Sequence, residues 1–297
     1  MLKAWKKQED SLKTLSFKII NGINPSDRLA ADSVFTRILV RALKQPNSFN
    51  YPFDSLNISK LYSPDSTFRI FTWQMLINEN IVRQHGAIQM KTANGSLKLF
   101  PLIDKSDVTQ NINDTIGNNN GWMGAVYYKI ILTKYLNHPY YTLLGYDENN
   151  IRSNKKIIEV LDFKDGQPVF GGRYFSIENS NVYTKNMARF IMEFKKEAAP
   201  RLTFDSELNM IVMEHLVSET GEPTKKWTYI PDGDYEGFKW INGKWAYVSK
   251  IFNEVTAEGK EPVPQPIRDA KGNIDNTKLK GNELDPPAPI KKKVEDD

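Results

Sequence analysis

The chain has 297 residues, enough for one large domain or two small ones, and its 40 basic and 36 acidic residues leave a formal net charge of only +4. This balance argues against nucleic acid as a partner, because nucleic-acid-binding proteins concentrate positive charge on one face or arm. The absence of cysteine excludes disulfides, thiolate metal sites and cysteine nucleophiles, and no apolar stretch approaches the ~20 residues of a membrane-spanning helix.

Residues 1–46 are predicted to form a helical segment. In its first half, residues 2–21, the apolar residues Leu12, Leu15 and Ile19 recur on one helical face. A helical pair of this size is expected to pack on something larger, since short helices gain most of their stability from tertiary contacts.

A second helix is predicted after the break at Pro25. Ser26 or Asp27 is expected to cap its first turn, and the helix should continue to about Gln45. Pro46 ends it, because the residue before a proline avoids the helical region.

Residues 47–252 are predicted to form an antiparallel β domain organised around residues 122–170. That stretch holds three runs rich in β-branched and aromatic residues, separated by short turns, which is typical of a meander. Weaker strands are expected to extend the same sheet, at residues 68–76, 87–91, 97–100, 188–194, 201–204, 210–216, 227–230, 235–240 and 245–250.

The predicted fold class is therefore α+β, mainly antiparallel β, with the helical segment packed on a many-stranded meander. Alternating strands and helices are absent, so a parallel doubly wound sheet is not expected, whereas a curved sheet, a sandwich or a propeller-like arrangement all fit. Residues 253–297 contain no aromatic residue and six of the 16 prolines. They are predicted to be a disordered tail, because they can bury too little apolar surface.

Residues 140–146 are predicted to form a central strand of the meander. Leu143 and Leu144 point to opposite faces, so a run that is apolar on both faces should be covered on both. Gly145 is expected to allow a close approach by a neighbouring group. The strand then leads into an oxygen-rich loop at the rim of the sheet.

This rim is the predicted ligand-binding site, formed by Tyr146, Asp147, Asn149 and Asn150. The alternative interpretation is a turn whose Asp and Asn side chains bond to nearby backbone.

The sequence identifies no catalytic residue, no metal ligand and no cofactor. His85, His138 and His215 lack a second histidine at helical spacing, and no phosphate-binding loop or Gly-x-Ser-x-Gly motif occurs. Gly171-Gly172 is interpreted as a turn. Paired carboxylates are conceivable, but nothing in the sequence marks two of them.

Aromatic residues are numerous enough to line a sugar- or peptide-binding groove. Antiparallel sheets also use them to fill cores, and that interpretation is favoured. The residues in question are Trp73, Trp122, Tyr127, Tyr128, Tyr140, Tyr141, Tyr146, Trp240 and Trp245.

Several sequence segments resemble those of an uncharacterised bacterial protein family with no established activity. One is Tyr-Tyr-Thr-Leu-Leu-Gly-Tyr-Asp at residues 140–147. The others lie at residues 48–54, 63–73, 155–161, 168–171, 210–216, 231–238 and 242–245. The resemblance covers roughly residues 47–248 and implies export, although this sequence shows no signal-peptide core after Met1. It carries over no catalytic residue.

The functional prediction is a non-enzymatic, exported binding or accessory protein of the bacterial cell envelope, with an unknown protein or carbohydrate ligand. The alternative is a carboxylate-dependent hydrolase acting on carbohydrate or peptide. The expected location is periplasmic or secreted if a signal peptide precedes Met1 in the native protein, and cytoplasmic otherwise.

Overall fold

The computed structural model describes residues 2–177 and 187–252, and the predicted tail lies outside these ranges. Two antiparallel helices, α1 (Leu2–Asn21) and α2 (Pro25–Leu43), begin the chain, as predicted. The predicted cap is wrong, since α2 starts at Pro25 and Asn24 is the cap residue, without a side-chain capping bond. Proline fits the first helical position because its missing N–H has no partner to lose there. None of the described helices has the length and apolar character to cross a membrane.

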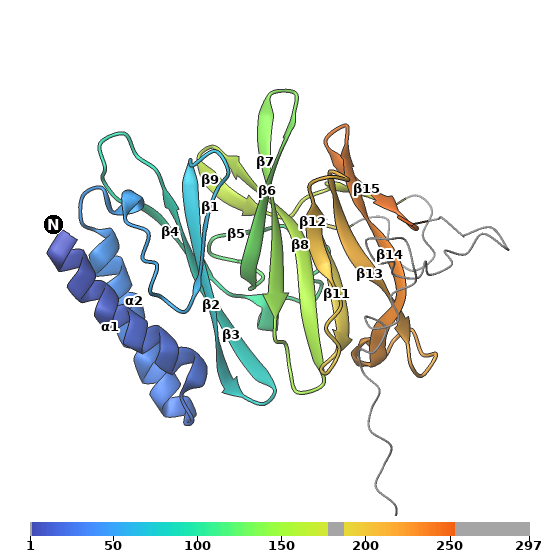
Figure 1. The fold of residues 1–297 in the computed structure, drawn as a ribbon, viewed down its shortest axis with the longest axis horizontal. Coiled ribbons are helices and arrows are strands. Elements are labelled where there is room, and N and C mark those ends of the chain that lie inside the picture. The colour runs from blue at the N-terminus through green and yellow to red at the C-terminus, as the bar shows by residue number, and fades with distance from the viewer. Residues whose placement is uncertain (1, 178–186, 253–297) are drawn as a thin grey trace, which may run out of the picture. The chain divides into compact units, whose positions relative to one another are not determined.

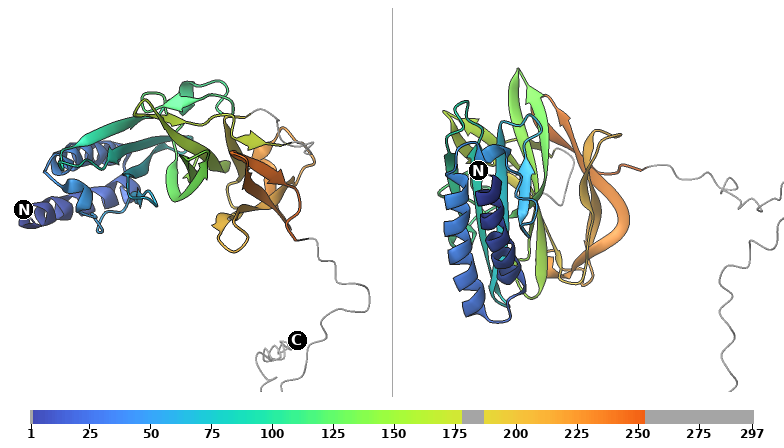
Figure 2. Two further views of the ribbon diagram at one scale, coloured as in Figure 1. Left: turned by 90° about the horizontal axis from the view of Figure 1, so that it is seen from above. Right: turned by 60° about the vertical axis from the view of Figure 1, so that its left-hand side comes forward.

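The first sheet has the order β1-β2-β3-β4 and is antiparallel throughout. Its strands are β1 (Ser59–Tyr62), β2 (Phe68–Asn78), β3 (Ile81–Met90) and β4 (Lys98–Ile103). The helices cover one face of this sheet (Figure 2) and share a core with Phe71, Trp73 and Met75 of β2. These strands form a sheet of their own, so the prediction that they extend the central sheet is wrong.

The central sheet contains the predicted meander, formed by β6 (Val126–Tyr135), β7 (His138–Asp147) and β8 (Ser153–Lys164). One edge of β8 is shared by two strands. β11 (Arg189–Lys195) pairs with its first half, and β9 (Gln167–Phe170) pairs with its last residues and leads to β5 (Gly117–Asn118).

The third sheet has the order β10-β15-β14-β13-β12. Its strands are β10 (Phe175–Ser176), β12 (Leu202–Asp205), β13 (Met210–Ser218), β14 (Tyr229–Ile241) and β15 (Lys244–Val248). β14 is one continuous strand where two were predicted, and β10 adds a parallel pair with β15. The helices, the first sheet, the central sheet and the third sheet follow one another in space (Figure 1).

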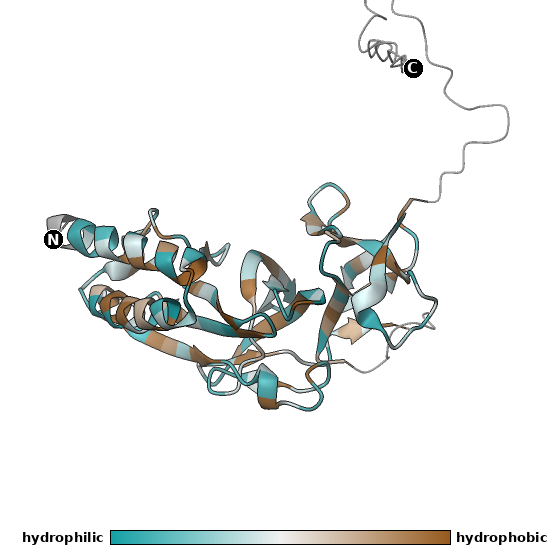
Figure 3. Ribbon diagram, turned by 90° about the horizontal axis from the view of Figure 1, so that it is seen from below, coloured by the Kyte–Doolittle hydropathy of each residue, from teal (hydrophilic) through white to brown (hydrophobic). Residues whose placement is uncertain are grey.

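Both faces of the central sheet are buried. The face with Leu144, Ile158 and Val160 packs toward the third sheet, and the face with Leu143 and Ile157 packs toward the first. Hydrophobic and hydrophilic segments accordingly mix along the strands (Figure 3). The predicted α+β class and the central position of β7 are both confirmed.

Candidate functional site

β11 is paired on one side only within the described part of the chain. An antiparallel ladder bonds every second residue to its neighbour, so backbone groups alternate between the two sides of a strand. Lys196 N donates to Arg152 O at 3.0 Å and so continues the ladder with β8. Met192 lies an even number of residues before Lys196, so its backbone N–H and C=O groups also point toward β8. Ile191 and Glu193 therefore direct their N–H and C=O groups to the other side, where no described residue bonds them.

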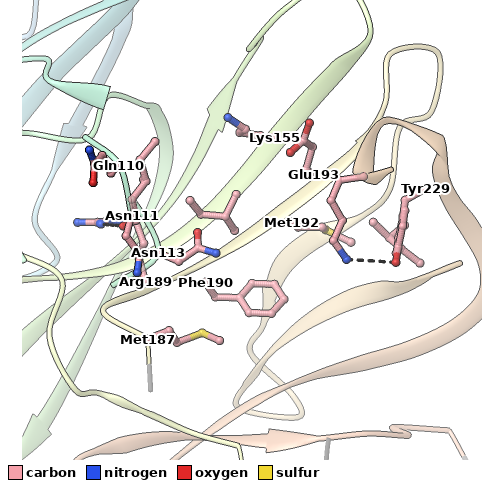
Figure 4. Close-up of a pocket in the computed structure, with 14 residues that line it drawn as sticks. Gln110, Asn111, Asn113, Lys155, Met187, Arg189, Phe190, Met192, Glu193 and Tyr229 are labelled. Carbon is pink, nitrogen blue, oxygen red and sulfur yellow. Dashed lines mark hydrogen bonds between the residues drawn. The ribbon is translucent and has the colours of Figure 1, made fainter. Parts of the chain in front are cut away.

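A cavity of about 460 Å³ follows this free edge of β11 (Figure 4). Residues 189–193 all line it, although successive side chains of a strand point to opposite faces. A cavity can touch all five only by running along the strand edge. The remaining lining residues come from the loop before β5, from β8, from the segment just before β11 and from the β13–β14 region. They are Gln110, Asn111, Ile112, Asn113, Lys155, Met187, Leu216, Lys226 and Tyr229.

The two sides of the cavity differ in chemistry. Phe190 and Met192 belong to the apolar core toward the third sheet, whereas Glu193 lies beside Lys155 of the adjacent strand (Figure 4). Glu193 Oε1 accepts a hydrogen bond from Ser153 Oγ at 2.6 Å. At the end near β14, Lys226 Nζ lies 4.3 Å from the centre of the Tyr229 ring and donates to its hydroxyl at 3.1 Å.

A buried polar network stands at the base of the cavity. Arg189 Nε donates to Glu159 Oε2 at 3.0 Å, and the Tyr127 hydroxyl donates to the other carboxylate oxygen. Trp122 Nε1 in turn donates to the Tyr127 hydroxyl at 2.7 Å. Burial is the largest of the causes that raise the pKa of Tyr127 far above its ordinary value, so it acts as a neutral donor.

The same arginine fixes the loop that closes the cavity. Its Nη1 donates to the carbonyl oxygens of Ile112 and, at 2.7 Å, Thr115, while Asn113 O accepts the backbone N–H of Ala188 at 2.7 Å. Arg189 Nη2 is buried and has no hydrogen-bond partner in the described structure. The loop is thus held by a side chain whose own charge is balanced by Glu159.

A second cavity of about 180 Å³ shares Ile112, Lys155 and Ile191 with the first. Two of the residues predicted from the sequence, Asp147 and Asn149, line this smaller space.

The structure separates the four residues of the predicted rim site. Tyr146 faces the core toward the third sheet, and Asp147 lies on the opposite face of β7. Asn150 Oδ1 accepts the backbone N–H groups of Arg152 and Ser153, so it is a turn residue. Their contact with a ligand stays a prediction.

Asp147 is held by two hydrogen bonds, from Gln84 Nε2 at 2.8 Å and from Asn149 N at 3.0 Å. Burial nevertheless raises the pKa of its carboxyl above the ordinary value. Gly145, two residues earlier in β7, confirms the predicted close approach, because a β-carbon there would lie 2.9 Å from Ala125 Cβ and 3.0 Å from the Tyr127 ring.

Each histidine pairs with a different aspartate. The ring–carboxylate distances are 3.2 Å for His85 and Asp32, 2.7 Å for His138 and Asp162, and 2.8 Å for His215 and Asp232. No group of three His, Asp or Glu side chains suited to a metal occurs among the described residues.

The aromatic residues divide between core and surface. Those that are buried are Trp73, Trp122, Tyr127, Tyr141 and Trp245, which confirms the core interpretation for them. Tyr140, Tyr146 and Trp240 are half-buried, and Tyr128 is exposed.

The interpretation of Gly171-Gly172 as a simple turn is incomplete. A β-carbon at residue 171 would lie 2.9 Å from Ala188 O, and Gly172 N donates to the same oxygen at 3.0 Å. These glycines let β9 and β11 meet along one edge of β8. Sequence reasoning predicted β11 as a strand but gave no sign that its edge would line a cavity.

Comparison with protein-family models, with curated proteins and with solved structures found no match for this chain. The candidate site is therefore defined by its geometry alone.

Proposed function

We propose that this protein is a non-catalytic, exported binding protein of the bacterial envelope, and that it binds an extended peptide segment along the free edge of β11. The observation that carries the proposal is the cavity that follows the outward backbone groups of Ile191 and Glu193. Unpaired strand edges bind extended peptides by main-chain hydrogen bonds, and flanking pockets select alternate side chains.

The chemistry of the cavity specifies the peptide. Side chains of an extended segment alternate between two faces. One set would enter the apolar side formed by Met187, Phe190 and Met192, and the other set would lie beside Lys155 and Glu193. The expected ligand therefore alternates apolar and charged or polar residues. The volume of the cavity, about 460 Å³, lies within the usual range of ligand pockets.

The hydrolase alternative has weaker support. Glu193 is the single carboxylate among the described residues that line the larger cavity, whereas carboxylate-based hydrolysis of glycosides needs two. Asp107 and Asp147 both line the smaller cavity, but Asp107 is an exposed partner of Arg83, with an N–O distance of 3.3 Å. No tryptophan is found among the described residues lining either cavity.

A display library of extended hexapeptides, selected on the full-length protein, tests the proposal. Ile191→Pro removes an outward N–H without removing a ladder bond to β8, and it should weaken selected peptides at least about tenfold. Ile191→Val keeps the N–H and is the matched control. Thermal unfolding of both variants verifies that each remains folded.

N-methylated versions of a selected peptide probe the same bonds without altering the protein. Methylation of alternate amides should abolish binding, and methylation of the amides between them should leave it unchanged. Binding that is equally insensitive, or equally sensitive, at every position would contradict strand addition. A selected ligand that is hydrolysed on incubation would favour the hydrolase.

A further inference from the structure

Two hairpin ends meet at one place on the surface. The first is the β6–β7 turn at Leu136 and Asn137, directly after Tyr135, and the second is the β14–β15 turn at Asn242 and Gly243, directly after Ile241 (Figure 1). A β-carbon at Gly243 would lie 2.7 Å from the Tyr135 ring, and Trp240 Nε1 donates to Lys134 O at 3.2 Å. The two turns therefore form one continuous surface, which we call the hairpin surface (residues 133–139 and 239–244).

Apolar side chains stand out from the hairpin surface. Leu136 is 82% exposed, Ile241 49% and Tyr135 38%. Leu136 also has a positive φ of 49° in a two-residue turn, a place where Asn, Asp or Gly is usual. Neither core packing nor turn chemistry accounts for a leucine there, and this backbone conformation is strained for a residue with a side chain.

The exposed ionised side chains of the hairpin surface are lysines, while the Asp162 carboxylate that pairs with His138 is buried. Lys134, Lys239 and Lys244 lie on its two segments, which contain no aspartate or glutamate. Trp240 and Tyr140 lie just behind the tips, with ring centres 5.6 Å apart. Exposed aliphatic tips, amphipathic aromatic rings and flanking lysines are the combination that protein surfaces use at a membrane–water interface.

We propose that the hairpin surface binds the surface of an anionic lipid bilayer. Leu136 and Ile241 enter the boundary between headgroups and acyl chains, and the lysines contact the negative headgroups. A second copy of the chain is the poorer occupant, because a two-fold contact through this surface brings lysines of the two copies together. The proposal is independent of peptide binding at β11, which lies in another part of the structure.

Co-sedimentation of the full-length protein with phosphatidylcholine vesicles, with and without phosphatidylglycerol, is the direct test. Wild type should bind the anionic vesicles at least about tenfold better than the neutral ones, and added salt should weaken this preference. Leu136→Asp combined with Ile241→Asp should remove binding to both. Lys134→Glu combined with Lys244→Glu should remove the preference for anionic lipid.

Matched controls lie at the other end of the structure. Ile23→Asp alters a side chain that is 91% exposed in the turn between α1 and α2. Lys13→Glu combined with Lys18→Glu makes the same charge change on α1. These controls should bind vesicles like wild type, and thermal unfolding should show every variant folded.

Equal loss of vesicle binding in the controls and the hairpin variants would overturn the proposal, as would wild-type protein that ignores anionic lipid. Concentration-dependent self-association that Leu136→Asp abolishes, without any vesicle binding, would assign the surface to a second copy instead.

Discussion

Both faces of the central sheet are buried, but by different kinds of side chain. Toward the third sheet, a core of mainly aliphatic and aromatic side chains includes scattered polar contacts, such as the hydrogen bond from Trp245 Nε1 to Thr142 Oγ1 at 2.8 Å and the bond from the Tyr247 hydroxyl to the buried Glu236 carboxylate. Toward the first sheet, the ion pair of Glu159 and Arg189 and the Tyr127 hydroxyl stand among apolar neighbours.

Because its two faces differ in this way, the central sheet can hold the fold together on one face and support a candidate site on the other. Apolar contacts are non-directional, so the face toward the third sheet fixes packing without fixing one arrangement of groups. A charged network is directional and costly to leave incomplete. On the face toward the first sheet it holds the loop of Ile112 and Thr115 against β11 and thereby shapes the cavity.

Breaking the ion pair should produce the largest effect. Arg189→Met leaves the Glu159 carboxylate and two loop carbonyls buried without their donor, and it should cost about 3–5 kcal/mol of unfolding free energy. Adding Glu159→Gln, which still accepts from Tyr127, should recover part of this loss. Urea unfolding of the two single variants and the double variant measures the coupling. A loss below about 1 kcal/mol for Arg189→Met would show that water replaces the guanidinium.

Truncating adjacent leucines compares the two faces directly. Leu144→Ala, on the apolar face, should cost about 2–5 kcal/mol, as for other fully buried leucines. Leu143→Ala opens a space opposite Glu159 in the β7–β8 register, and nearby polar groups can hold a water there. Its cost should therefore be the smaller of the two in the same unfolding assay. The reverse order would mean that the polar face is the more rigid one.

Loss of the hydrogen bond between Trp245 and Thr142, within the core toward the third sheet, should have an intermediate effect on stability. Thr142→Val keeps the shape of the side chain but leaves the Trp245 N–H buried and unpaired, which should cost about 1–3 kcal/mol. Thr142→Ser retains the hydroxyl as a control for the bond itself. Equal stabilities of Thr142→Val and wild type would indicate that this bond contributes nothing.

Asp147 should show the smallest effect, and it should depend on pH. Its folded-state pKa is raised by burial, so its stabilising contribution is present below the unfolded-state pKa of about 3.9 and is lost as pH rises through the folded-state pKa. Asp147→Asn keeps an oxygen for Gln84 and Asn149. It should unfold at a slightly higher temperature than wild type at neutral pH and show no such advantage near pH 3. A difference that does not vary with pH would contradict this assignment.

Local sequence rules determined most of the elements. Alternating apolar residues specified β11, a run apolar on both faces specified the central position of β7, and Asn242-Gly243 specified the last hairpin. Both residues of that turn have positive φ angles, which asparagine and glycine adopt readily. These features depend on neighbours in the chain, so they can be predicted from a short window of sequence.

Only the tertiary structure decided how the strands are divided among sheets. β9 and β11 share one edge of β8, and β10 pairs in parallel with β15 far along the chain. Such pairings depend on contacts between segments distant in sequence, for which composition and periodicity carry no signal.

In the candidate site too, some residues could be predicted from the sequence, whereas others were brought together only by the tertiary structure. The sequence drew attention to Asp147 and Asn149, which reach the smaller cavity, while the larger cavity joins a polar loop, an edge strand and the β13–β14 region. Arg189 looks in the sequence like a polar interruption of a strand. Its position opposite Glu159 depends on the pairing of β11 with β8. Arginine and glutamate are usually surface residues, but here both are buried as an ion pair that supports the cavity.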